Sequence, residues 1–255
     1  MKLKSNIFFL LLVLAFASCD KNIPQGQLIP DSFTKRVLIE EFGGEWCSFC
    51  VGGAVRFEEL LNKNPEHYIG VSLHYDDPFE IKYPNIVGML LSKFEIISFP
   101  YTIVDRTIDE EKSWEVQSEF RLSKSMDIGI KVKTEIVNNN LDITIDFVSK
   151  RDMTDIYLSV YIVENNVPES SPGAQSGGGG QYIHRHVLRK ILTKRPGDPL
   201  VLIKNKIQTS EFAGIRLGQY DNSNVEVVAF IHRGTSNSFE VLNANRAKVN
   251  DVSGW

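Results

Sequence analysis

The sequence is poor in cysteine, has no block of like charges, and contains a single extended apolar segment. Three cysteines among 255 residues are too few for a fold held together by several disulfides. With 28 Lys and Arg against 32 Asp and Glu, the chain lacks the basic excess that nucleic-acid binding requires. The four glycines at 177–180 are not followed by the Lys and Ser or Thr of a phosphate-binding loop. These absences exclude disulfide-rich scaffolds, nucleic-acid partners and P-loop nucleotide binding.

The extended apolar segment lies at the N-terminus. Two lysines within the first four residues precede an apolar stretch at 7–16, which is too short to span a bilayer but typical of a secretory signal. The following Phe-Ala-Ser-Cys, ending at Cys19, resembles a bacterial lipobox with Phe where Leu is usual. We therefore predict a lipoprotein signal peptide over residues 1–19 and a lipid on Cys19, because several acyl chains together anchor a protein stably. A plain signal peptide cut near Ala17 is the alternative.

Three regions that differ in composition and periodicity follow this signal. Residues 20–32 contain prolines and a glycine without periodicity and are predicted to form a flexible tether. Residues 33–125 alternate apolar strands with helical patterns, which indicates an α/β sheet. Residues 126–255 show strand patterns only, which indicates an antiparallel β-sandwich of the immunoglobulin-like kind.

Individual elements can be placed from the same patterns. Within residues 33–125, strands are expected at 37–42, 68–73 and 101–105, and helices from the cysteine motif to Asn64-Pro65, at 86–94 and at 114–122. Within residues 126–255, a hairpin is expected to pair 128–133 with 141–147, and further strands are expected at 156–163, 182–192, 225–231 and 239–249. Residues 169–181 are expected to form a long mobile loop within the sandwich.

The other two cysteines form a Cys-x-x-Cys motif at Cys47 and Cys50. The motif follows a strand and two glycines and opens a predicted helix. Unpaired N–H groups and the positive end of the helix dipole favour a thiolate there, so Cys47 is expected to be the more acidic and more exposed sulfur. Cys50, one turn further on, can attack a mixed disulfide and release a substrate. The pattern predicts thiol–disulfide exchange, with Trp46 shielding the site.

Residues 37–50 and Phe99-Pro100-Tyr101-Thr102 resemble the thioredoxin superfamily. The resemblance implies a cis-proline at Pro100 beside the disulfide. It also implies that Glu41 is a buried acid that moves protons from the second cysteine, a role that a raised pKa suits. The chain departs from the superfamily because Ser48-Phe49 replaces the usual Gly-Pro. In addition, Glu40, Glu41 and Glu45 are expected to place negative charge near Cys47 and to oppose thiolate formation.

A resemblance that covers nearly the whole mature chain is to the outer-membrane "twenty-eight kilodalton" lipoprotein family. It is carried by residues 37–42, Trp46-Cys47, Cys50, Tyr182-Ile183-His184 and Val187-Leu188-Arg189. This resemblance implies a thioredoxin-like domain followed by a β-rich C-terminal domain. It also implies a lipid-anchored location in the cell envelope, at the outer membrane.

Other interpretations of the cysteines and histidines are weighed beside this one. The Cys47–Cys50 pair could be a purely structural disulfide, although closing so short a loop gains little stability. A metal site would need histidine, and His74 is the candidate in the same region. His184 and His186 lie two apart, on one face of a strand, but no third ligand is identifiable. We therefore expect surface or packing roles for these histidines, and no metal or cofactor.

Two hypotheses about function follow. In the first, the protein is a membrane-tethered thiol–disulfide oxidoreductase acting on exported proteins or peptides. Its catalytic residues are Cys47, Cys50 and Glu41, and its substrate groove is formed by Trp46, Phe99, Pro100 and Tyr101. In the second, it is a surface binding or adhesion lipoprotein that keeps the fold as a scaffold, with a disulfide that does not cycle. The substrate and the direction of electron flow stay open.

Overall fold

The computed structural model describes residues 29–109, 112–234 and 238–255. The signal peptide predicted over 1–19, the lipidation site at Cys19, and most of the tether predicted over 20–32 therefore lie outside the described residues. No helix among the residues that the structure describes is long and apolar enough to cross a membrane.

The first part of the chain alternates strands and helices as predicted. Its elements are β1 (Val37–Gly43), α1 (Cys50–Lys63), β2 (Tyr68–His74), α2 (Ile86–Lys93), β3 (Tyr101–Val104) and α3 (Trp114–Leu122). Strand β1 is central, parallel to β2 on one side and antiparallel to β3 on the other. Both β1 and β2 are buried along almost their whole length, which explains why each is a continuous apolar run.

The second part is built from strands. These are β4 (Ile128–Val137), β5 (Asn140–Ser149), β6 (Met153–Glu164), β7 (Val167–Pro168), β8 (Ile183–His184), β9 (Val187–Ile191), β10 (Asp198–Leu202), β11 (Gln208–Ile215), β12 (Val225–Arg233) and β13 (Val241–Lys248). The predicted hairpin is β4–β5, and Asn138 and Asn139 at its tip have φ of 50° and 61°. Two-residue turns of this kind require positive φ, which Asn tolerates.

Two expectations about these strands are corrected. The single strand expected at 182–192 is two, β8 and β9, because the chain turns at His186, where φ is 53°. Strands β7, β10 and β11 were not predicted. β11 lies at the edge of its sheet with every side chain half-buried or exposed, so it lacks the apolar content that marks a strand in a sequence.

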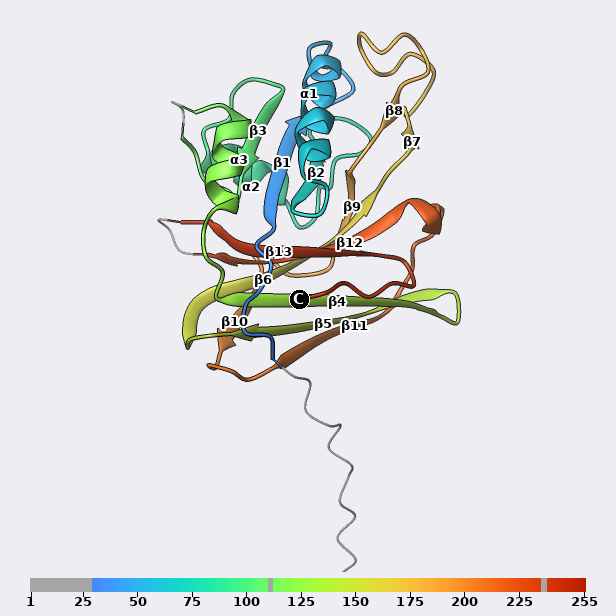
Figure 1. The fold of residues 1–255 in the computed structure, drawn as a ribbon. Coiled ribbons are helices and arrows are strands. Elements are labelled where there is room, and N and C mark those ends of the chain that lie inside the picture. The colour runs from blue at the N-terminus through green and yellow to red at the C-terminus, as the bar shows by residue number, and fades with distance from the viewer. Residues whose placement is uncertain (1–28, 110–111, 235–237) are drawn as a thin grey trace, which may run out of the picture.

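Two sheets make up most of the fold. The larger runs β13-β12-β6-β9-β2-β1-β3, with β10 also paired to β6, and the smaller runs β11-β5-β4. The smaller sheet packs against β6 and β12 around an aliphatic core that includes Ile143, Ile145, Val160 and Val227. Figure 1 shows this pair of layers below the helices. The chain is thus a mixed α/β protein with a sheet-rich second half.

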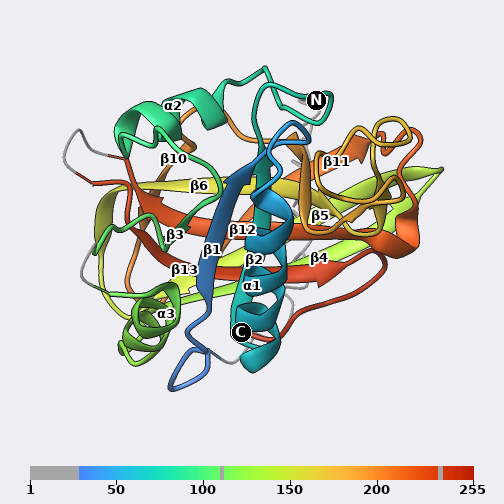
Figure 2. The same ribbon diagram turned by 90° about the horizontal axis from the view of Figure 1, so that it is seen from above.

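The two parts of the chain share the larger sheet. Strand β9 pairs antiparallel with β6 and, through Ser72 and Val187, parallel with β2. One apolar cluster accordingly combines Phe42 and Leu73 with Tyr161 and Phe230. Figure 2, seen from above, shows β1 and β2 crossing over the long strands β12 and β13. The boundary predicted at residue 126 falls between α3 and β4, but the packing continues across it.

Candidate functional site

Cys47 and Cys50 form a disulfide between the end of β1 and the start of α1. Their Cα atoms are 5.3 Å apart, and the Cys50 nitrogen donates a 3.2 Å hydrogen bond to the Cys47 carbonyl oxygen. Cys50 is the first residue of α1, so Cys47 precedes the helix. The two residues are only 5% and 9% exposed. Cys47 is therefore not the more exposed cysteine that the sequence led us to expect.

Glu41 lies in β1 on the side covered by the first turn of α1. A Cβ added at Gly53 of α1 would lie 2.5 Å from Pro100 Cγ and 3.1 Å from Glu41 Oε1. Helix, proline and carboxyl group are therefore packed together, and this close approach explains the glycine. Burial, together with the nearby charge of Glu58, raises the pKa of Glu41 to about 8. Its Oε1 atom has no hydrogen-bond partner among the described residues.

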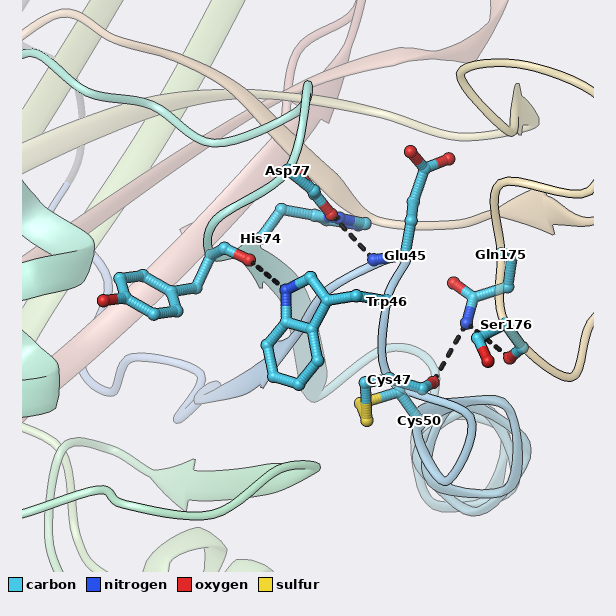
Figure 3. The surroundings of a disulfide bond; sticks show 9 residues. Glu45, Trp46, Cys47, Cys50, His74, Asp77, Gln175 and Ser176 are labelled. Atoms are coloured by element: carbon cyan, nitrogen blue, oxygen red, sulfur yellow. Dashed lines mark hydrogen bonds and ion pairs between the residues drawn. A yellow bond between two sulfur atoms is a disulfide. The ribbon is translucent and has the colours of Figure 1, made fainter.

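Of the three glutamates expected to place negative charge near Cys47, one carries a raised pKa and the other two are engaged on sides away from the sulfur atoms. Glu41 is protonated below its pKa of about 8. Glu40 is adjacent in the strand and so faces the opposite side, where it accepts hydrogen bonds from Arg106. Glu45 is 3% exposed and points away from the sulfur atoms (Figure 3). Its carboxylate accepts a 2.7 Å hydrogen bond from the Ser170 nitrogen and another from the Ser170 hydroxyl.

Aromatic residues border the disulfide on another side. The Phe99–Pro100 peptide bond is cis, as the resemblance to thioredoxins implied. The Trp46 ring meets the Phe99 ring edge-on, with centroids 5.4 Å apart, and Trp46 Nε1 donates a 2.9 Å hydrogen bond to the Tyr75 carbonyl. Tyr75 in turn stacks on Phe99. Tyr101 begins β3 and packs with Phe99 against the core. The structure thus brings the four expected groove residues to one region.

The three histidines considered as metal ligands, His74, His184 and His186, lie in two separate groups, and none of the contacts described for them involves Cys47 or Cys50. His74 Nδ1 is 2.5 Å from Asp77 Oδ2, and its ring lies 4.9 Å from the ring of His184. Burial and the neighbouring His74 lower the pKa of His184 to about 4. His186, at the turn between β8 and β9, contacts Glu58 instead. In the part of the chain that the structure describes, no group of three or more His, Cys, Asp or Glu could hold a metal.

Residue Gln175 belongs to the site but was not predicted. Its Nε2 atom donates a 3.0 Å hydrogen bond to the Cys47 carbonyl oxygen, and the side chain is buried. The surrounding segment, 169–181, is packed against the residues before Cys47 and is not the free loop that its composition suggested. Gly177, Gly179 and Gly180 have φ of 76° to 91°, so the glycines allow tight turns that other residues rarely adopt. No local pattern identifies a contact between residues so far apart in sequence.

Comparison with known proteins places the chain in a family. The sequence profile of the family described as outer membrane protein Omp28 matches residues 89–253. The match begins after the disulfide, so it does not include Cys47 and Cys50. No curated protein matches the chain.

Among solved structures, HBP35 of Porphyromonas gingivalis is similar, with a TM-score of 0.68 and 22% identity over 86% of this chain and 76% of that chain. A structural-genomics protein from Agrobacterium tumefaciens has a TM-score of 0.56 and 9% identity over 88% of this chain and 97% of that chain. A domain of the outer membrane lipoprotein Omp28 from Porphyromonas gingivalis covers 49% of this chain and 89% of its own length, with 18% identity and a TM-score of 0.33. At these identities the first two similarities concern the fold alone.

Proposed function

The chain belongs to the Omp28 family of outer membrane proteins, and we propose that in the cell envelope it acts as a thiol–disulfide oxidoreductase on exported proteins or peptides. One observation carries this proposal. The Cys47–Cys50 disulfide opens a helix whose first turn packs on both a cis-proline and a carboxyl group with a pKa of about 8. The order and pairing of β1, α1, β2 and β3 support a thioredoxin-like first half. A lipid on Cys19 would hold the protein at the membrane.

Each cysteine has a distinct role in the reductive direction. The Cys47 thiolate attacks a substrate disulfide and forms a mixed disulfide, and one substrate sulfur leaves as a thiolate. Cys50 then attacks the Cys47 sulfur, which releases the second substrate sulfur and restores the Cys47–Cys50 bond. Two electrons pass from the protein dithiol to the substrate. In the oxidative direction the same steps run in reverse.

In this proposal Glu41 accepts and returns the proton of the second cysteine, Cys50. A thiol must lose its proton before its sulfur can attack, and water has little access to a residue as buried as Cys50. The ionised Glu41 carboxylate accepts the proton from Cys50 in the reductive direction, and the protonated carboxyl returns it in the oxidative one. A pKa of about 8 keeps both forms accessible near neutral pH.

The helix and the aromatic residues supply the other requirements. Phe49, the residue before α1, makes no side-chain hydrogen bond to the helix N-terminus. The Cys50 N–H donates to the Cys47 carbonyl oxygen, but no described side chain caps the N–H groups that follow it, and in this proposal these stabilise a thiolate. Trp46, Phe99, Pro100 and Tyr101 form the substrate groove in this proposal, and an extended peptide would pair with backbone beside Pro100.

Replacing the nucleophile tests the proposal. Cys47→Ser in the mature chain is expected to abolish the reduction of insulin by dithiothreitol above the uncatalysed rate. The matched variant Cys50→Ser should instead trap a mixed disulfide with the substrate, visible as a mass increase that a reductant reverses. Wild-type activity in Cys47→Ser would contradict the proposal.

A binding or adhesion role is the second candidate. It is favoured by the burial of both cysteines and by a family match that starts after them. Equilibration with glutathione separates the two functions. A potential between about −120 and −270 mV is the range of exchange catalysts, whereas one below about −300 mV is that of structural disulfides.

A further inference from the structure

We propose that Gln175 is a positioning residue for the Cys47–Cys50 disulfide, and that docking of residues 169–181 favours its oxidised form. The inference deepens the proposed function and rests on it for its biological meaning. The coupling itself is a property of the disulfide, and can be measured whether or not the protein is an enzyme.

The side chain of Gln175 fixes the backbone of Cys47 from the second half of the chain. Its amide donates hydrogen bonds of 3.0 Å to the Cys47 carbonyl and 3.1 Å to the Ser176 carbonyl. The Cys47 carbonyl also accepts from Cys50, and the Cys47 nitrogen donates to Gly44 at 3.0 Å. Figure 3 shows the amide approaching from the side away from the sulfur atoms. Gln175 thus restrains the backbone of Cys47 without contacting its sulfur from that side.

Two further contacts hold the segment in place. Ser170 donates to the buried carboxylate of Glu45, and the Ser176 nitrogen donates a 2.6 Å hydrogen bond to the Glu45 carbonyl. A Cβ added at Gly177 would lie 3.2 Å from the Ser48 carbonyl oxygen, so the glycine turn packs directly on the motif. Residues 169–181 therefore contact the chain immediately before Cys47, at Cys47 itself and immediately after it.

These contacts are present with the disulfide formed, and their geometry predicts which form, disulfide or dithiol, the docked segment favours. Reduction turns one covalent bond into two thiols that must move apart to van der Waals contact. Because Cys47 is only 5% exposed and densely packed, this movement has to displace its backbone or neighbours. A segment bonded to that backbone resists the displacement and so stabilises the disulfide. By linkage, reduction must weaken the docking of the segment by the same factor.

The reduction equilibrium of matched glutamine variants tests this. Gln175→Ala removes the amide, and Gln181→Ala removes an exposed glutamine from the same segment. In glutathione buffers, Gln175→Ala is expected to shift the equilibrium about three- to tenfold toward the dithiol, the effect of one buried hydrogen bond, or about 15 to 30 mV toward a higher potential. Gln181→Ala should match the wild type. An unchanged equilibrium in folded Gln175→Ala, or a shift toward the disulfide, would overturn the proposal.

Hydrogen exchange of the wild-type protein provides a second test that needs no variant. Amides of residues 169–181 are expected to exchange faster in the dithiol form than in the disulfide form, while those of β12 stay unchanged. Equal exchange in the two forms would overturn the proposal even if Gln175→Ala failed to fold. The oxidoreductase proposal fails separately, if insulin reduction survives Cys47→Ser.

Discussion

Arg106 donates two hydrogen bonds of 2.8 Å to the carboxylate of Glu40, and both side chains are almost completely buried. A third hydrogen bond of 2.9 Å runs from the guanidinium group to the Tyr161 hydroxyl oxygen in β6. The ring of Phe230 in β12 lies 4.8 Å from the guanidinium carbon. This charged group therefore connects β1 of the first half to two central strands of the second.

Removing one partner of this pair should destabilise the protein strongly. In Arg106→Leu, the Glu40 carboxylate would be left buried without a counter-charge, and we expect a loss of about 3–5 kcal/mol of unfolding free energy. Urea unfolding of the oxidised protein measures it. Lys112→Ala, which breaks an exposed ion pair with Asp109, is the control and should cost at most about 1 kcal/mol. If Arg106→Leu lost no more unfolding free energy than this control, the buried ion pair would not be needed for stability.

The raised pKa of Glu41 predicts a pH dependence of stability. In the unfolded chain this carboxyl ionises near its ordinary pKa of about 4.3, whereas in the folded protein it keeps its proton up to a pKa of about 8. Between these values the folded state binds more protons, so the free energy of unfolding should fall as pH rises from about 4.3 to 8. The loss should be complete above the folded pKa and amount to no more than about 5 kcal/mol.

Variants isolate this effect from other titrations. Glu41→Gln has no ionisable group at this position, so its stability relative to the wild type should increase between pH 5 and pH 9. Glu59→Gln on the exposed side of α1 is the control and should follow the wild type. Urea unfolding at the two pH values, with the disulfide intact, measures the difference. Parallel behaviour of Glu41→Gln and the wild type would mean that Glu41 ionises normally.

Trp46 is predicted to contribute to substrate binding through its exposed ring. It is 48% exposed and rests against Phe99 beside the disulfide. If the ring contacts the substrate, Trp46→Ala should raise KM for insulin about three- to tenfold. The same variant should change kcat by a smaller factor than KM. Phe120→Ala removes an aromatic ring of α3 that is 49% exposed, and should leave both constants unchanged. Equal kinetic constants for the two variants would show that Trp46 is not part of the substrate groove.

Local sequence patterns were enough to predict the strand and helix around the cysteines and several other elements. The apolar run of β1, the helix after Cys47 and the helix at Trp114–Leu122 lie where the sequence placed them. The hairpin through Asn138 and Asn139 was predicted for the same reason. Each of these depends on periodicity or turn chemistry within a few residues, which neighbouring side chains and backbone sterics largely determine. The cis bond at Pro100 was expected from a resemblance, since composition alone does not specify the isomer.

The sequence by itself determined the helices, most strands and the Cys47–Cys50 motif, because these follow from short-range physics. The tertiary structure alone decided the surroundings of the motif. It pairs Glu40 with Arg106, leaves Glu41 Oε1 without a hydrogen-bond partner among the described residues, and brings Gln175 onto Cys47 from 128 residues away. It also joins the two halves through β9. Contacts between such distant residues depend on how whole layers pack, and no local periodicity records them.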